Sequence, residues 1–87
     1  MDKVVTAFKK NSTEEVRAGI QEFKGRHYAF VRVFVENDVG ETVPTKKGLT
    51  LSVDLLPRLF QTVRALATEA VTQGLVEPES FSEELAL

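Results

Sequence analysis

The sequence predicts an α+β domain in which antiparallel strands come first and one amphipathic helix follows. Residues 15–23 alternate apolar and polar side chains, and residues 28–36 alternate aromatic or arginine side chains with small or β-branched ones; both patterns have the period of a strand. Residues 55–71 carry apolar side chains at every third or fourth position, which is the period of a helix. A chain of 87 residues has room for one such domain.

The two alternating stretches are expected to pair as a hairpin. Gly25 lies between them, where the chain must reverse, and glycine adopts the positive φ values that tight hairpin turns require. Residues 28–36 give the strongest strand signal in the chain. A second turn is expected at residues 37–40, where Asn, Asp and Gly occur together.

A further strand is expected over residues 42–51. Pro44 and Gly48 interrupt it, which favours an edge position, a bulge or a split into two short strands. Residues 4–8 are a candidate for a short additional strand, and the polar residues 11–13 after them predict a turn or a flexible joint.

The two faces of the strand at residues 28–36 differ in kind. Ala29, Val31, Val33 and Val35 point one way, and Tyr28, Phe30, Arg32 and Phe34 point the other. Small and β-branched side chains suit a core, so the aromatic and arginine side is expected to face outward.

The helix is expected to run for about five turns and to stop at Gly74. Asp54 is preferred to Ser52 as the N-cap, because Pro57 then falls in the first turn. The apolar stripe is wide for one small sheet, so part of it is expected to pack against the same helix of a second subunit. The residues expected at this dimer interface are Leu59, Phe60, Val63, Leu66, Ala67 and Ala70.

The net charge of -2 conceals a segregation of charge along the chain. All 11 basic residues precede Val76, whereas four of the 13 acidic residues follow Leu75. This predicts three parts: a basic leader at residues 1–13, the β-and-α domain at residues 14–75, and an acidic C-terminal tail at residues 76–87. The tail is interpreted either as a solvated terminus or as a segment that recruits a protein partner.

Catalysis is not expected, because the sequence lacks the residues and motifs that common catalytic sites need. The sequence has no Cys, a single histidine (His27), no glycine-rich phosphate loop and no cluster with metal-ligand spacing, so neither a metal nor a cofactor is expected. The absence of Cys suits a reducing intracellular compartment, either cytoplasm or nucleoid. No signal peptide and no apolar run near the roughly 20 residues of a membrane span are visible.

Binding is better supported, because exposed rings can stack on bases while basic side chains neutralise phosphates of a single strand of any sequence. The residues predicted to bind single-stranded DNA are Arg17, Phe23, Lys24, Arg26, Tyr28, Phe30, Arg32, Phe34, Lys46 and Lys47. Alternatives left open are a second core face covered by other parts of the protein, a protein-interaction module that uses this face or the acidic tail, and RNA binding.

Three motifs in register carry a family resemblance: residues 22–26 (EFKGR), 31–34 (VRVF) and 45–52 (TKKGLTLS). They resemble the hairpin, strand and helix-approach motifs of the single-stranded-DNA-binding domain of the transcriptional coactivator family called positive cofactor four. The match spans roughly residues 15–70. The resemblance implies four curved antiparallel strands and a helix, dimerisation through the helices, and two antiparallel DNA channels on the sheets.

Carried over by position, the resemblance implies that Phe23 stacks on a base, and that Arg26, Arg32 and Lys47 are basic contacts. The family's strand tryptophan aligns with Val35, which removes one stacking platform, and the sequence leaves open whether Phe34 or Phe30 replaces it. The family's long Ser- and Lys-rich arm is absent, as in compact bacterial and phage members. The sequence therefore predicts a homodimer that holds melted DNA during replication, recombination or transcription, alone or with proteins of those processes.

Overall fold

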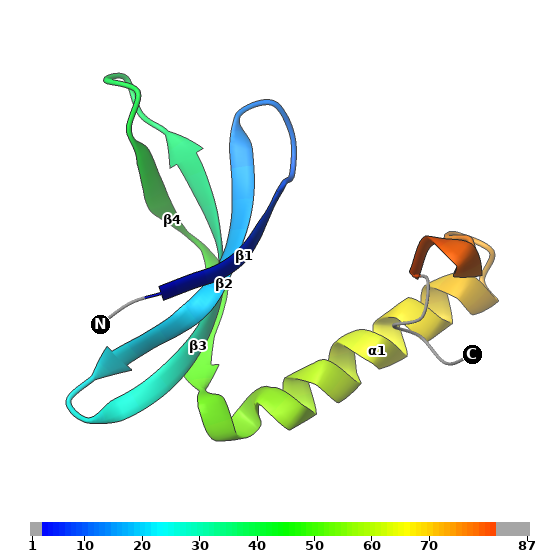
Figure 1. Ribbon diagram of the computed structural model, residues 1–87. Coiled ribbons are helices and arrows are strands. Elements are labelled where there is room, and N and C mark those ends of the chain that lie inside the picture. The colour runs from blue at the N-terminus through cyan, green and yellow to red at the C-terminus, as the bar shows by residue number, and fades with distance from the viewer. Residues whose placement is uncertain (1–2, 82–87) are drawn as a thin grey trace. The chain divides into compact units, whose positions relative to one another are not determined.

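Four antiparallel strands form one sheet in the order in which they occur in the chain (Figure 1). The strands of this computed structural model, which describes residues 3–81, are β1 (Lys3–Lys9), β2 (Glu14–Phe23), β3 (Arg26–Glu36) and β4 (Thr42–Ser52). One α-helix follows, so the predicted α+β class and the predicted order of elements are confirmed. The candidate strand at residues 4–8 is real and forms one edge of the sheet.

Asparagine side chains shape two of the turns between strands. In the β1–β2 turn, Oδ1 of Asn11 accepts hydrogen bonds from the backbone N–H groups of Thr13 and Glu14, at 3.0 and 2.8 Å. Asn37 forms equivalent bonds in the β3–β4 turn. Such side-chain bonds replace the ladder bonds that the backbone loses where it reverses. The polar residues at 11–13 therefore form an ordered turn.

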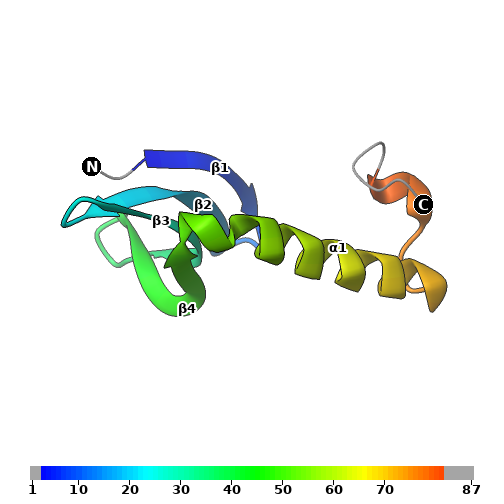
Figure 2. The same ribbon diagram turned by 90° about the horizontal axis from the view of Figure 1, so that it is seen from below.

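Strand β4 is an edge strand with a pronounced bulge. Arg32 of β3 pairs with Gly48, whereas Phe34 pairs with Pro44, so residues 45–47 lie opposite a single residue of β3. Gly48 has a φ of 145°, which side-chain-bearing residues rarely adopt. The strand bends sharply in Figure 2. Of the alternatives that Pro44 and Gly48 indicated, the structure has the edge position and the bulge.

The sheet buries few side chains. Among residues 3–81, the buried apolar side chains are Ala29 and Phe30, which are 6% and 7% exposed. The ring of Phe30 lies over Gly19, its partner across the β2–β3 ladder, and a Cβ at Gly19 would fall 2.8 Å from the ring's Cζ. The prediction that Phe30 offers an exposed ring is therefore wrong, because a glycine opposite leaves room for the ring to lie flat on the sheet.

Helix α1 spans Leu56–Thr72 and begins without a side-chain cap. The predicted cap at Asp54 is wrong, since the residue in the capping position is Leu55. A short 3₁₀ turn, Val53–Leu55, precedes the helix, and the carboxylate of Asp54 in this turn accepts a hydrogen bond from the hydroxyl of Ser52 at the end of β4. This bond holds the pKa of Asp54 below its usual value of 3.8. Pro57 lies in the first helical turn, as predicted.

The end of the helix matches the prediction at Gly74, which has a φ of 73°. The N–H of Gly74 donates to the carbonyl of Val71, and that of Leu75 donates to Ala70, both at 2.9 Å. This pair of bonds is a Schellman motif, which a glycine in the left-handed region allows. A final 3₁₀ turn covers Pro78–Phe81.

The chain divides into two units, one that ends at Asp54 and one that begins at Leu55. The first holds the sheet, and the second holds α1 and the 3₁₀ turn. Of the predicted acidic tail, residues 82–87 lie outside the described part of the chain. Within residues 3–81, no helix has the length and apolar character needed to cross a membrane.

Candidate nucleic-acid interface

The register of the sheet sorts its side chains into two faces, because residues paired across antiparallel strands point to the same side. We call the side that carries the arginines and rings the aromatic face, and the side that carries Val31, Val33 and Val35 the valine face. The β2 and β3 residues of the aromatic face are Glu15, Arg17, Gly19, Gln21, Phe23, Arg26, Tyr28, Phe30, Arg32, Phe34 and Glu36. The predicted alternation of both strands is thus confirmed.

Arg17 and Phe34 are in contact on this face. The guanidinium carbon of Arg17 lies 4.8 Å from the centroid of the Phe34 ring, within the range of a cation–π interaction. The Nε of Arg17 also donates to Oε1 of Glu15 at 2.5 Å. The cation–π contact and the ion pair hold the guanidinium over the ring, so that charge and ring are presented together.

Arg32 is held by the bulge of β4. Its Nη1 donates to the backbone carbonyl of Thr45, and its Nη2 donates to Oγ1 of Thr50, both at 3.1 Å. Thr45 is itself fixed, because its hydroxyl donates to the carbonyl of Val33 at 2.8 Å and accepts from the N–H of Lys47 at 3.1 Å. Thr45 and Thr50 were not among the residues predicted for this site. The interruption of the strand at Pro44 and Gly48 could have indicated them, because a bulge leaves backbone carbonyls free to accept hydrogen bonds from side chains nearby.

Phe23 lies at the exposed tip of the β2–β3 hairpin and is 59% exposed. It pairs with Arg26 across the turn, so both belong to the aromatic face. The turn residues Lys24 and Gly25 have φ values of 52° and 78°, as in a two-residue type I′ turn. The ammonium of Lys24 lies 5.3 Å from the Phe23 ring centroid. The tip thus brings one ring and two cations together, as the sequence indicated.

The two lysines of the bulge are exposed, but Lys47 does not gather with Arg32. Its Nζ lies 3.9 Å from Oε2 of Glu14, whose register partner Val35 is on the valine face. Oε1 of Glu14 is 3.5 Å from the Nζ of Lys10. A hydrogen bond from Asn11, opposed in part by desolvation and aided by the two lysines, holds the pKa of Glu14 below its usual value of 4.5.

The ion pair between Lys47 and Glu14 is a surface contact of the kind that contributes little to stability, since Lys47 is 70% exposed. Lys46 is exposed as well. Of the ten residues predicted to bind DNA, the structure places Arg17, Phe23, Arg26, Tyr28, Arg32 and Phe34 on one face, with Lys24 at its tip. Phe30 belongs to the same face but is buried, and the ammonium of Lys47 lies near Glu14.

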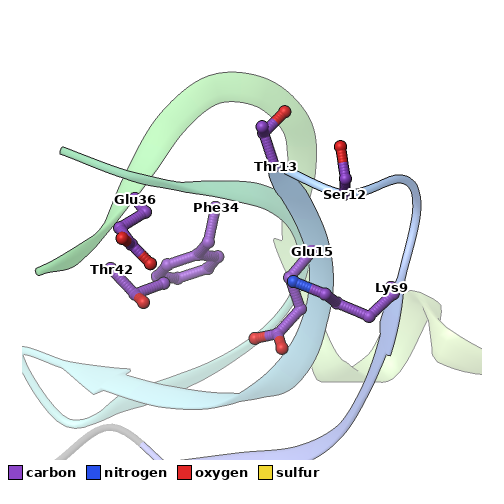
Figure 3. A pocket seen from close by; sticks show the side chains of 7 residues that line it. All are labelled: Lys9, Ser12, Thr13, Glu15, Phe34, Glu36 and Thr42. Atoms are coloured by element: carbon purple, nitrogen blue, oxygen red, sulfur yellow. The ribbon is translucent and has the colours of Figure 1, made fainter. Parts of the chain in front are cut away.

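A polar hollow of about 260 Å³ opens at one end of the aromatic face (Figure 3). It lies where the β1–β2 turn meets the far ends of β3 and β4. Its lining residues are Lys9, Ser12, Thr13, Glu15, Phe34, Glu36 and Thr42. Sequence reasoning did not find this hollow, because residues from all four strands and one turn form it.

Helix α1 carries its apolar side chains in one stripe. Phe60, Val63 and Leu66 are 65%, 53% and 67% exposed, which is high for apolar side chains of this size. The other residues predicted at a dimer interface, Leu59, Ala67 and Ala70, are partly exposed on the same side. Among residues 3–81, no group of three or more His, Cys, Asp or Glu side chains is arranged to hold a metal ion.

The four-stranded meander, the bulged edge strand and the single long helix place the chain in a class of small α+β proteins with one arginine-rich, aromatic sheet face. Comparison with known families makes the assignment specific. Residues 10–62 match the family described as Transcriptional Coactivator p15 (PC4), and the chain belongs to that family.

Solved structures agree with this assignment. A PC4 homologue from Burkholderia pseudomallei K96243, in its tetragonal crystal form, is 29% identical, with a TM-score of 0.70 over 78% of this chain and 98% of the other. Its orthorhombic form gives 30% identity and a TM-score of 0.67 over 76% and 88%.

The bacteriophage T5 homologue of the eukaryotic coactivator PC4, a protein implicated in recombination-dependent DNA replication, is 25% identical. Its TM-score is 0.71 over 95% of this chain and 93% of the phage chain. A search of curated proteins finds no significant match. The resemblance stated from the sequence motifs is confirmed.

Proposed function

We propose that this protein binds single-stranded DNA on the aromatic face, with little sequence preference, and that it does so as a homodimer. The observation that carries the proposal is the cation–π pair of Arg17 and Phe34 next to the anchored Arg32. These side chains form one surface with the exposed Phe23 at the hairpin tip. Such a surface offers rings to bases and cations to phosphates at the same time.

The aromatic face offers two kinds of contact to a single strand: cations for the phosphates and rings for the bases. The cations replace counterions along the phosphates, and this contribution to the affinity does not depend on the base sequence. They are Arg17, Arg26, Arg32 and the neighbouring lysines. Phe23, Tyr28 and Phe34 provide π-faces, on which any base can stack. Phe30 contributes by supporting the face from within, because its ring fills the space over Gly19.

Membership in the PC4 family supports this assignment. The phage T5 relative is implicated in recombination-dependent DNA replication, which makes replication and recombination the processes in which we expect this protein to hold melted DNA. A role in transcription is consistent with the family description.

Dimerisation through α1 is part of the proposal. A monomer in which only Ala29 and Phe30 are buried apolar side chains, among residues 3–81, has too small a core for a stable chain of this size. The exposed stripe that includes Phe60, Val63 and Leu66 supplies the missing apolar surface when a second copy covers it. Because the stripe contains both large residues and alanines, two such helices can approach closely.

The test is fluorescence anisotropy of a labelled oligonucleotide of about 20 bases, as single-stranded DNA, duplex DNA and single-stranded RNA, over a salt series. We expect tight binding of the DNA single strand, with a slope of roughly -3 to -4 in log affinity against log salt for four to six phosphates. Equal binding of the RNA strand would extend the function to RNA. Absence of binding at low salt would overturn the proposal.

A second function is favoured for the start of the acidic tail. Leu75 and Val76 are 72% and 36% exposed, and the acidic residues Glu77 and Glu79 follow them. An apolar pair beside carboxylates is suited to recruiting a basic protein partner or to competing with DNA for the aromatic face. Deletion of residues 76–87 tests both versions: unchanged DNA affinity together with unchanged capture of replication, recombination or transcription proteins would exclude them.

A further inference from the structure

The polar hollow at the end of the aromatic face combines features that phosphate binding does not require. Its five strand residues share this face, because Lys9 pairs with Glu15, Glu15 with Phe34, and Glu36 with Thr42 in the ladders. Figure 3 shows the Phe34 ring between Glu15 on one side and Glu36 and Thr42 on the other. The hollow is therefore continuous with the surface proposed to bind the strand.

Two carboxylates make the hollow unsuitable for a phosphate. Oε1 of Glu15 accepts from Arg17, so this group is already engaged. Glu36 forms no ion pair with any residue in the described range 3–81, and its side chain is exposed. A free carboxylate beside a ring repels the DNA backbone but accepts hydrogen bonds from the N–H groups of a base. The occupant that fits is a neutral base rather than a phosphate.

The bases differ in what they present to such a group. On its Watson–Crick edge, guanine carries the donors N1–H and N2–H₂ side by side, followed by the acceptor O6. A carboxylate takes both donors at once, and an ammonium such as that of Lys9 reaches the acceptor. Thymine presents one N–H between two carbonyls, which a carboxylate disfavours. Adenine and cytosine present a single amino group beside an acceptor nitrogen.

We propose that this hollow is a guanine-binding subsite, in which Phe34 stacks on the base, Glu36 accepts from N1–H and N2–H₂, and Lys9 donates to O6. The inference rests on the proposed function, because the base is delivered by a strand that lies on the aromatic face. It adds a local base preference to binding that is otherwise tolerant of sequence. The strand would place one base at this end of the face, beyond Arg17 and Arg32.

The experiment compares an all-thymine strand of about 20 bases with strands that carry a single guanine at the 5′ end, the centre or the 3′ end. A single guanine per strand prevents four-stranded structures. We expect the best guanine strand to bind about fivefold more tightly than the all-thymine strand, or better, and adenine or cytosine at that position to give a smaller gain. Hypoxanthine, which lacks the N2 amino group, should lose most of the guanine gain.

Glu36→Gln tests the residue, with Glu41→Gln as the matched control. Both changes remove one negative charge near the β3–β4 turn, so each raises the affinity for every strand, and that rise cancels in the ratio of guanine to thymine affinities. We expect the ratio to fall to about one in Glu36→Gln and to stay at the wild-type value in Glu41→Gln. Thermal melting of both variants verifies that they are folded.

The outcomes separate this inference from the function on which it rests. If no strand binds, the proposed function fails. If the all-thymine strand binds and a guanine adds nothing at any position, the function stands and the guanine subsite is overturned. A guanine preference that persists in Glu36→Gln, or that hypoxanthine reproduces in full, would also overturn the assignment.

Discussion

The guanidinium of Arg32 donates to the backbone carbonyl of Thr45, 13 residues further along the chain, at 3.1 Å. The bond joins the central strand β3 to the bulge of β4, and a second bond to Thr50 completes the anchor. An arginine held in this way presents its remaining N–H groups in a fixed direction, which lowers the entropic cost of binding a phosphate. The irregular edge strand thus orders a charge on the proposed DNA surface.

Arg32→Ala should weaken binding of single-stranded DNA and reduce the salt slope by roughly 0.7 for each phosphate that Arg32 contacts. Arg32→Lys should keep most of the slope, because the charge remains, but should bind more weakly than wild type, because an ammonium cannot bridge Thr45 and Thr50 in the same fork geometry. Anisotropy over a salt series measures both quantities. A slope in Arg32→Ala equal to that of the wild type would remove Arg32 from the phosphate contacts.

Phe23→Ala should show the opposite signature. Loss of the exposed ring is expected to cost about 1 to 3 kcal/mol for one stacked base while it leaves the salt slope nearly unchanged. Val39→Ala is the matched control, since Val39 is an exposed apolar residue in the β3–β4 turn, away from the hairpin tip. A large change of slope in Phe23→Ala, or an equal loss in the control, would contradict the stacking role.

Gly48→Ala should destabilise the fold far more than Gly40→Ala. Both glycines have positive φ, 145° and 83°. A Cβ at Gly48 would lie 2.4 Å from the carbonyl oxygen of Val31 and 2.7 Å from the Cα of Arg32, whereas a Cβ at Gly40 would meet nothing within 4 Å. We expect the Gly48 variant to lose at least about 2 kcal/mol more than the control in urea unfolding. Equal losses would mean that the bulge relaxes to accept a side chain.

Most of the fold could be predicted because its signals are local. The alternation in β2 and β3 depends on neighbouring side chains, and the hairpin turn and helix stop depend on Gly25 and Gly74, each of which has positive φ. The failed prediction of the helix start also has a local cause. Asp54 is a good capping residue, but it lies in the 3₁₀ turn, its side chain accepts a hydrogen bond from Ser52, and the helix begins two residues later.

The details of the candidate site depended on register, which composition does not reveal. Phe30 was expected among the exposed rings, but its partner across the ladder is Gly19, so the ring is buried. Lys47 was expected among the basic residues around the exposed rings, but its ammonium lies 3.9 Å from Oε2 of Glu14. The hollow at Phe34 forms only when all four strands pair in the observed register. Each of these features needs pairings between residues far apart in the sequence.

Glu14→Gln should make stability less dependent on pH. The pKa of Glu14 is lowered in the folded protein, chiefly by the hydrogen bond from Asn11. The folded state therefore binds this proton more weakly than the unfolded state, and the stabilisation is present above the usual value of 4.5 and is lost as pH falls through the lower folded pKa. The wild type should melt at a higher temperature than the variant at pH 7, and this gap should close below pH 4.5.

Added salt distinguishes the ionic contacts of Glu14 from its hydrogen bond with Asn11 as causes of this pH dependence. Added salt screens the contacts of Glu14 with Lys10 and Lys47, but it leaves the short hydrogen bond from Asn11 in place. Most of the gap between wild type and Glu14→Gln at pH 7 should therefore survive in 1 M salt, a concentration at which the Debye length is about 3 Å. A gap that is the same at pH 3 and pH 7 would show that Glu14 acts through something other than its charge.

Leu66→Asp should disrupt the proposed dimer. Leu66 is 67% exposed on the apolar stripe of α1, and a carboxylate buried between two helices without a partner is strongly unfavourable. We expect the dimer dissociation constant to rise by about 100-fold or more, measured by sedimentation equilibrium. Thr68→Asp adds the same charge to an exposed position two residues along the same helix, on its polar side, and should leave the dimer intact. A wild-type chain that sediments as a monomer at all concentrations, or a Leu66→Asp variant that remains dimeric, would show that α1 does not pair with a second copy.

Because two subunits carry two aromatic faces, a monomeric variant should also lose the gain in affinity that long strands have over strands too short to reach both faces.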